Sequence, residues 1–203
     1  MSWYLLLVVI CAVVSLGGAV YYVHCALGGK AKPVIATWIL MMVMMGLSVW
    51  TYAHSPSKSL TANIGIIAGA VNVFMILTGV VWMNIRRGVS LRATFDLIQI
   101  LCLLGGVGVF VFWVVTESHL ISYIAIQAIA LLAYAATVNK LRKAHTITEP
   151  LLFWIAMLVA GLSAIYPAVV RQDVFAAIYL IRAVPSTGVV IYLIWKIQRR
   201  MRL

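Results

Sequence analysis

The sequence consists almost entirely of seven apolar runs, each about as long as a helix that crosses a lipid bilayer. Such a helix needs about 20 mostly apolar residues. The runs between polar breaks cover 3–27, 33–53, 61–85, 93–115, 119–138, 150–170 and 174–195. With 65% hydrophobic and 9% charged residues, the chain leaves no room for a soluble domain. We therefore predict an all-α integral membrane protein with seven transmembrane helices in a single domain, 1–203.

The basic residues predict how these helices are oriented. The net charge of +11 would suggest nucleic acid as the partner of a soluble protein, but here the cations stand only in short gaps and form no continuous basic face. Twelve of the 15 Lys and Arg follow the first, third, fifth and seventh runs: Lys30, Lys32, Arg86, Arg87, Arg92, Lys140, Arg142, Lys143, Lys196, Arg199, Arg200 and Arg202. Because basic loops stay in the cytoplasm, we expect a multi-pass protein of the cell membrane with its N-terminus outside and its C-terminus in the cytoplasm.

Two stretches of the chain match each other in order. Gly-Leu-Ser occurs at 46–48 and at 161–163, Tyr52 corresponds to Tyr166, and Trp-x-x-x-Arg-Arg occurs at 82–87 and at 195–200. Chance is the alternative, because these residues are common in transmembrane helices. A true repeat predicts a first triple-helix unit at 1–88, a linker helix at 89–117 and a second triple-helix unit at 118–203. A single linker helix makes the two units parallel, an arrangement known among transporters.

In this architecture and in several motifs the chain resembles the SWEET, SemiSWEET and PQ-loop transporter superfamily. The motifs are the stretch 134–139, the basic turn Lys140-x-Arg142-Lys143, Pro150, Phe153-Trp154 and the segment from Gly161 to Tyr166. The Pro-Gln pairs of the family are absent, so the resemblance is distant. It implies a solute-binding site formed by aromatic residues on the second helix of each unit and polar residues on the third. By position these residues are Tyr52 with Trp50 beside it, Tyr166, Asn72 and Arg182.

Arg182 is the one cation inside an apolar run. It stands about eight residues into the seventh run, or roughly 12 Å along the helix, so we expect it to face the interior of the protein. Either it binds an anionic solute or it pairs with another helix. Pro185 predicts an unwound helix midpoint beside it. Asn72 stands at a similar depth, where it either binds solute or joins two helices through a hydrogen bond.

The remaining residues favour no chemistry that would make the chain an enzyme. The His and Cys residues are scattered, so we predict no metal and no cofactor. We predict a carrier that moves a small polar solute, with anions among the candidates, by alternating access. The alternative is a non-transporting subunit or receptor that binds a lipid, a quinone or a partner protein. The expected partners are a small-molecule solute and membrane lipid. The sequence is compatible with a homo-oligomer, and we expect no nucleic acid partner.

Overall fold

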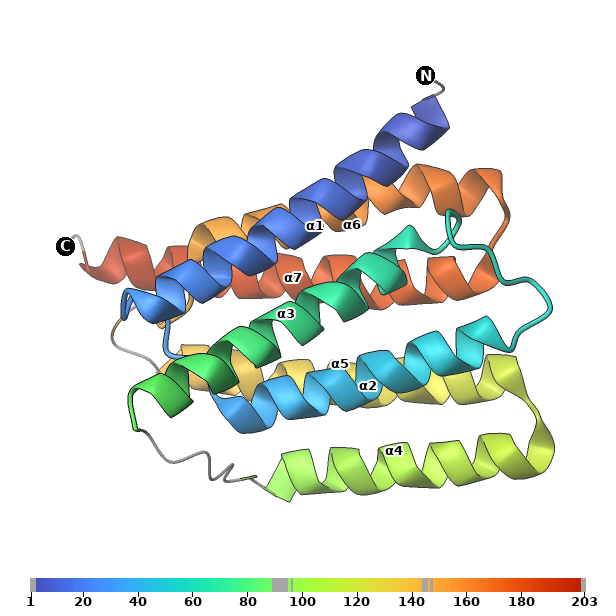
Figure 1. Ribbon diagram of the computed structural model, residues 1–203, viewed down its shortest axis with the longest axis horizontal. Coiled ribbons are helices and arrows are strands. Elements are labelled where there is room, and N and C mark those ends of the chain that lie inside the picture. The colour runs from blue at the N-terminus through green and yellow to red at the C-terminus, as the bar shows by residue number, and fades with distance from the viewer. Residues whose placement is uncertain (1–2, 89–94, 96, 144–145, 147, 202–203) are drawn as a thin grey trace.

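The computed structural model describes residues 3–88, 95, 97–143, 146 and 148–201, and the secondary structure of these residues is helical throughout, with no strand. The helices, shown in Figure 1, are α1 (Trp3–Leu27), α2 (Ile35–Ala53), α3 (Ile64–Arg86), α4 (Leu97–Thr116), α5 (His119–Lys143), α6 (Leu151–Val170) and α7 (Val174–Met201). All seven predicted helices are confirmed, and α5 and α7 continue several residues beyond the predicted ends. Each is long and apolar enough to cross a membrane, which indicates a multi-pass membrane protein.

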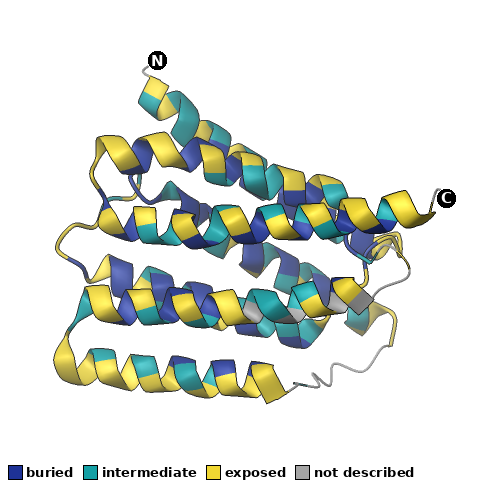
Figure 2. Ribbon diagram, turned by 180° about the vertical axis from the view of Figure 1, so that it is seen from behind, coloured by how far each residue is buried: buried dark blue, intermediate teal, exposed yellow. Residues whose placement is uncertain are grey.

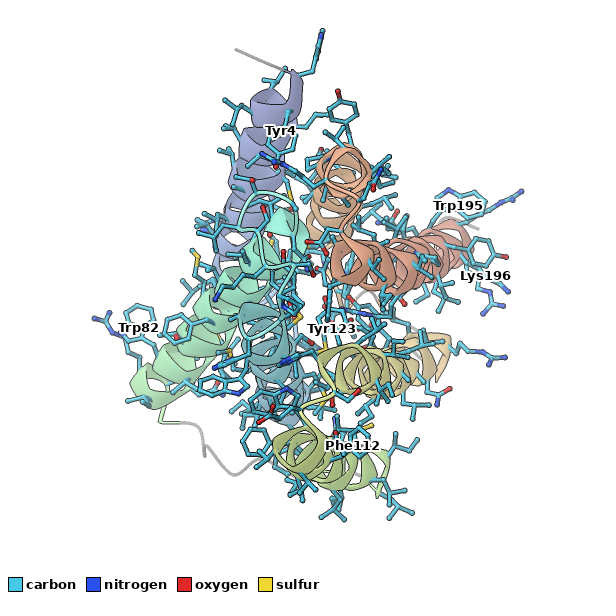
Figure 3. All side chains as sticks on the ribbon, turned by 90° about the vertical axis from the view of Figure 1, so that its right-hand side faces the viewer. Tyr4, Trp82, Phe112, Tyr123, Trp195 and Lys196 are labelled. Carbon is cyan, nitrogen blue, oxygen red and sulfur yellow. The ribbon has the colours of Figure 1, made fainter. Side chains whose placement is uncertain are left out.

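Six of the helices form a ring. Their most extensive contacts run in the order α1, α3, α2, α5, α7, α6 and back to α1. The helix α4 lies outside this ring and packs against α2 and α5, as Figure 3 shows along the bundle. Contacts of α3 with α6 and α7 cross the interior. Side chains that point into the ring therefore come from helices far apart in the sequence.

The outer surface of the bundle is apolar. Figure 2 shows exposed residues along the outward faces of the helices, and most of α4 is exposed. The exposed side chains include Val107 and Val115 on α4 and Ile181 on α7. Lipid tails surround such faces in a membrane, whereas the backbone polar groups are paired within each helix.

The two ends of the bundle differ in charge. The helices α1, α3, α5 and α7 finish at the end that holds the C-terminus (Figure 1), which we call the basic end; the other is the opposite end. Two of the predicted cytoplasmic cations, Arg92 and Arg202, lie outside the described residues.

The middle of α7 stays helical. The expectation that Pro185 unwinds it is wrong, because the helix is continuous from Val174 to Met201. Proline removes only its own amide donor, and neighbouring hydroxyls can strengthen the adjacent turn. Here the Ser186 hydroxyl donates a 2.7 Å hydrogen bond to the carbonyl oxygen of Arg182.

Candidate functional site

A cavity of about 320 Å³ lies within the bundle and is lined by residues from all seven helices. At the basic end it is lined by Val34 and Glu149, and it extends toward the opposite end as far as Gly65 and Tyr179. Pockets of this volume hold small molecules in many proteins. The cavity therefore provides space for a solute at the centre of the membrane-spanning region.

Arg182 lines this cavity, as its position in the sequence predicts. The side chain is only 7% exposed, and its guanidinium carbon lies 5.6 Å from the ring centroid of Tyr134 and 5.0 Å from that of Tyr179. Its Nη2 atom is buried and has no hydrogen-bond partner. Among the residues that the structure describes, no carboxylate pairs with Arg182. Among the described residues, two aromatic faces and one amide lie in direct contact with this positive charge.

A chain of hydrogen bonds fixes the orientation of Arg182. Its Nε atom donates to Gln127 Oε1 on α5 at 3.1 Å, and Gln127 Nε2 donates to the Ser48 hydroxyl on α2 at 2.8 Å. The Ser48 hydroxyl in turn donates to the Met44 carbonyl oxygen at 2.7 Å. All three side chains are buried. Arg182 is therefore held by neutral groups of two other helices, which leave its charge uncompensated.

Two glycines of α3 make room for Tyr179. A Cβ atom on Gly65 would lie 2.9 Å from the Tyr179 ring, and one on Gly69 would lie 2.9 Å from the Tyr179 hydroxyl. Larger side chains here would push this ring out of its place beside Arg182. The close approach of α3 to α7 is thus part of how the site is built.

Asn72 also lines the cavity, but its amide nitrogen is already engaged. It donates to the carbonyl oxygen of Ser15 on α1 at 2.6 Å and to the sulfur of Met157 on α6 at 3.6 Å. The side chain therefore joins three helices, and its carbonyl oxygen is the group left to accept a hydrogen bond from a solute.

Aromatic side chains line the cavity toward the basic end. The Tyr22 ring packs against Trp38 and Phe153, with centroids 5.1 and 4.8 Å apart, and its hydroxyl donates to Glu149 at 3.1 Å. Trp154 packs against Phe153 and lines the cavity, and its Nε1 atom is buried without a hydrogen-bond partner. The wall here consists mainly of flat apolar faces, with Glu149 and one unpaired donor among them.

Tyr52 lies beyond the cavity, at the opposite end. It is on the same face of α2 as the cavity-lining Met45 but about 10 Å further along the helix. Its hydroxyl accepts a hydrogen bond from the Ser59 amide at 2.6 Å and donates one to Asp173 Oδ2 at 2.6 Å. Asp173 Oδ1 also accepts from the Ala176 amide at 3.0 Å, which caps the start of α7. Tyr52 and Asp173 thus join α2 to α7.

Aromatic rings pack edge to face beside this contact. The Phe175 ring lies 5.7 Å from Tyr52 and 5.0 Å from Tyr123 on α5, measured between centroids. Figure 3 shows Tyr123 inside the bundle. Together these buried rings fill the space between the cavity and the opposite end.

The other two aromatic residues expected at the site lie on the outside of the protein. Tyr166 is 46% exposed, because α6 turns its face with Phe153 and Met157 toward the cavity and Tyr166 is on the other side. Trp50 is 49% exposed and packs against Trp113 of α4. Of the five residues expected at the site, the structure brings Arg182 and Asn72 to one cavity and leaves the three aromatic residues outside it.

Sequence reasoning did not place Tyr179, Tyr134, Trp154 or Glu149 at the site. A signal existed for Tyr179, which precedes Arg182 by three residues and so shares its helix face. No comparable signal marks the others, because their approach depends on the ring order of the helices. Within the described part of the chain, no three of the His, Cys, Asp and Glu residues come together as metal ligands. No protein-family model, curated protein or solved structure matches this chain.

Proposed function

We propose that the protein is a SWEET-like carrier that moves a small polar solute across the cell membrane by alternating access through this cavity. The observation that carries the proposal is a cavity lined by all seven helices, in whose wall Arg182 has a donor that no described residue pairs. A hydrogen bond from α2 to the residue before α7 lies beyond one end of this cavity. A cavity at the membrane midplane with access from alternate sides is the common design of such carriers.

The order of the helix contacts supports two parallel triple-helix units, α1–α3 and α5–α7, with α4 as linker. Exchanging α1, α2 and α3 for α5, α6 and α7 leaves the ring order unchanged. Side chains of the matched motifs also make the same contact: Arg86 lies 4.2 Å from the Trp82 ring and Arg199 lies 5.7 Å from the Trp195 ring. Trp82 and Trp195 project from opposite flanks of the bundle (Figure 3).

In this proposal, the contact between Tyr52 and Asp173 closes the extracellular end. Tyr52 belongs to the first unit, and Asp173 precedes the last helix of the second. The cavity extends to the basic end, which is cytoplasmic in the predicted orientation. Release of this hydrogen bond, with rotation of the two units about their interface, would open the cavity to the outside.

The proposal is tested by water access at two neighbouring positions of α7. In a variant that lacks Cys11, Cys25 and Cys102, one cysteine is placed at Ala183, which lines the cavity, or at Ile181, which is 74% exposed on the outer surface. Sealed vesicles are treated with a membrane-impermeant, charged thiol reagent from either side. The two positions differ by only about 3 Å in depth.

A carrier predicts that Ala183→Cys reacts from both sides, and that a transported solute slows the reaction. Ile181→Cys, which faces lipid, stays unreactive. Inertness of Ala183→Cys from both sides, together with no solute uptake in proteoliposomes, would contradict the carrier and favour a non-transporting subunit or receptor.

A further inference from the structure

Two residues that line the cavity each carry a buried hydrogen-bond donor for which the described residues offer no acceptor. They are Nη2 of Arg182 and Nε1 of Trp154, and each side chain is 7% exposed. A guanidinium group and an indole nitrogen can only donate. A buried donor without an acceptor is costly, so such atoms in a native protein call for an explanation.

The described part of the chain provides no acceptor for either atom. Gln127 accepts from Nε of Arg182, and the Tyr134 and Tyr179 rings lie against the guanidinium group without offering an acceptor to Nη2. Because Gln127 and the two rings fix the guanidinium group, its free donor is held in place before a ligand arrives. Such preorganisation favours binding of an oxyanion, to which arginine donates strong, charge-assisted hydrogen bonds.

The two donors belong to neighbouring side chains. Tyr134 contacts both, since its ring centroid is 5.6 Å from the Arg182 guanidinium carbon and 6.2 Å from the Trp154 ring, which places the guanidinium carbon and the Trp154 ring less than about 12 Å apart. The cavity volume of about 320 Å³ corresponds to roughly ten water molecules. A solute with about that number of non-hydrogen atoms spans the distance.

The other cavity residues restrict the charge and the shape of this solute. Glu149 lines the cavity and disfavours a second negative charge on the solute. The flat faces of Trp38, Phe153 and Tyr134 favour an apolar or planar body. Building on the proposed carrier function, we propose that the solute is a small organic monocarboxylate, with its carboxylate bound by Arg182 and a second oxygen bound by Trp154.

The test measures thermal unfolding of the purified full-length protein in neutral detergent with added solutes. The probes are para-hydroxybenzoate, its uncharged amide, benzoate, glucose and an anionic phospholipid. Benzoate keeps the carboxylate but lacks the para-hydroxyl oxygen that we propose Trp154 binds. We expect para-hydroxybenzoate to raise the melting temperature by several degrees in a saturable manner. The amide should bind at least tenfold more weakly, and glucose should have no effect.

Three variants assign the effect to the two donors. Arg182→Gln should abolish stabilisation by para-hydroxybenzoate, whereas Arg199→Gln, the same charge change outside the cavity, should leave it unchanged. Trp154→Phe keeps an aromatic ring, though a smaller one, and removes the donor, so it should abolish the advantage of para-hydroxybenzoate over benzoate. The unliganded melting temperature of each variant shows whether it has folded.

The inference is overturned if para-hydroxybenzoate and its amide stabilise equally, if neither stabilises, if Arg182→Gln responds like the wild type, or if only the phospholipid stabilises. Stabilisation and uptake of glucose would overturn the monocarboxylate while leaving the carrier in place. The carrier proposal is contradicted by a different result, namely inertness of Ala183→Cys from both sides together with no solute uptake. Failure of the monocarboxylate and failure of the carrier are therefore distinguishable.

Discussion

The Tyr52 hydroxyl donates a 2.6 Å hydrogen bond to the Asp173 carboxylate, and this contact joins α2 to the start of α7 at the opposite end of the bundle. Both side chains are 3% exposed. Hydrogen bonds to buried charged groups contribute about 1.5–3 kcal/mol. In the proposed carrier, a contact of this strength is enough to shift the balance between closed and open forms of this end.

Tyr52→Phe removes this hydrogen bond and keeps the ring against Phe175. We expect the free energy of unfolding to fall by about 1–3 kcal/mol, because the Asp173 carboxylate loses a buried donor. If the proposed carrier is right, external labelling of Ala183→Cys should become faster, since the end that Tyr52 and Asp173 join would open more often. Tyr166→Phe is the matched control, because Tyr166 is the counterpart of Tyr52 in the predicted repeat and is 46% exposed. Equal labelling rates in the two variants would contradict this role of Tyr52.

Arg182→Met tests whether the protein keeps its buried charge at a cost. Arg182 has no carboxylate partner among the described side chains. A central arginine costs about 2.5–3.5 kcal/mol in membrane insertion, so an apolar side chain of similar length should leave the unliganded protein as stable or about 1–2 kcal/mol more stable. Solute uptake should be lost. A clear fall in the melting temperature would instead indicate that Arg182 holds the bundle together.

The helices were predictable because the hydrocarbon core makes the length of an apolar run decisive. The length of the apolar run predicts an end for α7 that is too early, because the helix continues through Lys196 and Arg199 to Met201. Those basic residues stand outside the apolar core. Their charged ends can reach water there, so the helix continues without burying a charge. The order of the ring was not predictable from the helices alone, because every helix is apolar on most faces.

The site was predictable only where burial of a residue is expensive. Arg182 and Asn72 stood out because polar side chains in hydrocarbon need partners. Asp173 follows the α6 run and looks like a helix cap, and only the approach of α2 brings Tyr52 to its second oxygen. Tyr166 was chosen by its offset in the repeat, but the rotation of α6 turns it away from the cavity.

Gln127→Glu places a carboxylate 3.1 Å from Nε of Arg182. The new ion pair would neutralise the charge that we propose for solute binding, so carboxylate uptake should fall at least tenfold. The melting temperature should not fall, because the new carboxylate has Arg182 as a close partner and the Ser48 hydroxyl can turn to donate to it.

Gln127→Leu is the contrasting variant. It removes the acceptor of Arg182 and the donor to Ser48, so it should destabilise the protein by about 1–3 kcal/mol. If Gln127→Glu transported carboxylates like the wild type, the charge of Arg182 would have no part in binding.

Gly69→Ala tests the close approach of α3 to α7 beside Arg182. The added Cβ would lie 2.8 Å from Cε of Met45 and 2.9 Å from the Tyr179 hydroxyl. The methionine end can move, but the Tyr179 ring lies between α3 and the Arg182 guanidinium group, so we expect a loss of about 1–3 kcal/mol in the free energy of unfolding. Tyr179 would also shift from the guanidinium group, which should weaken carboxylate binding.

Gly46→Ala is the control for this substitution, because a Cβ on Gly46 meets no atom within 4 Å. Alanine is the better helix former, so this variant should gain about 0.5–1 kcal/mol. Both variants are compared by unfolding in mixed detergent micelles and by the response of the melting temperature to para-hydroxybenzoate. If Gly69→Ala matched Gly46→Ala in both measurements, Tyr179 would not need the space that Gly69 leaves, and the geometry of Arg182 would not depend on the α3–α7 contact.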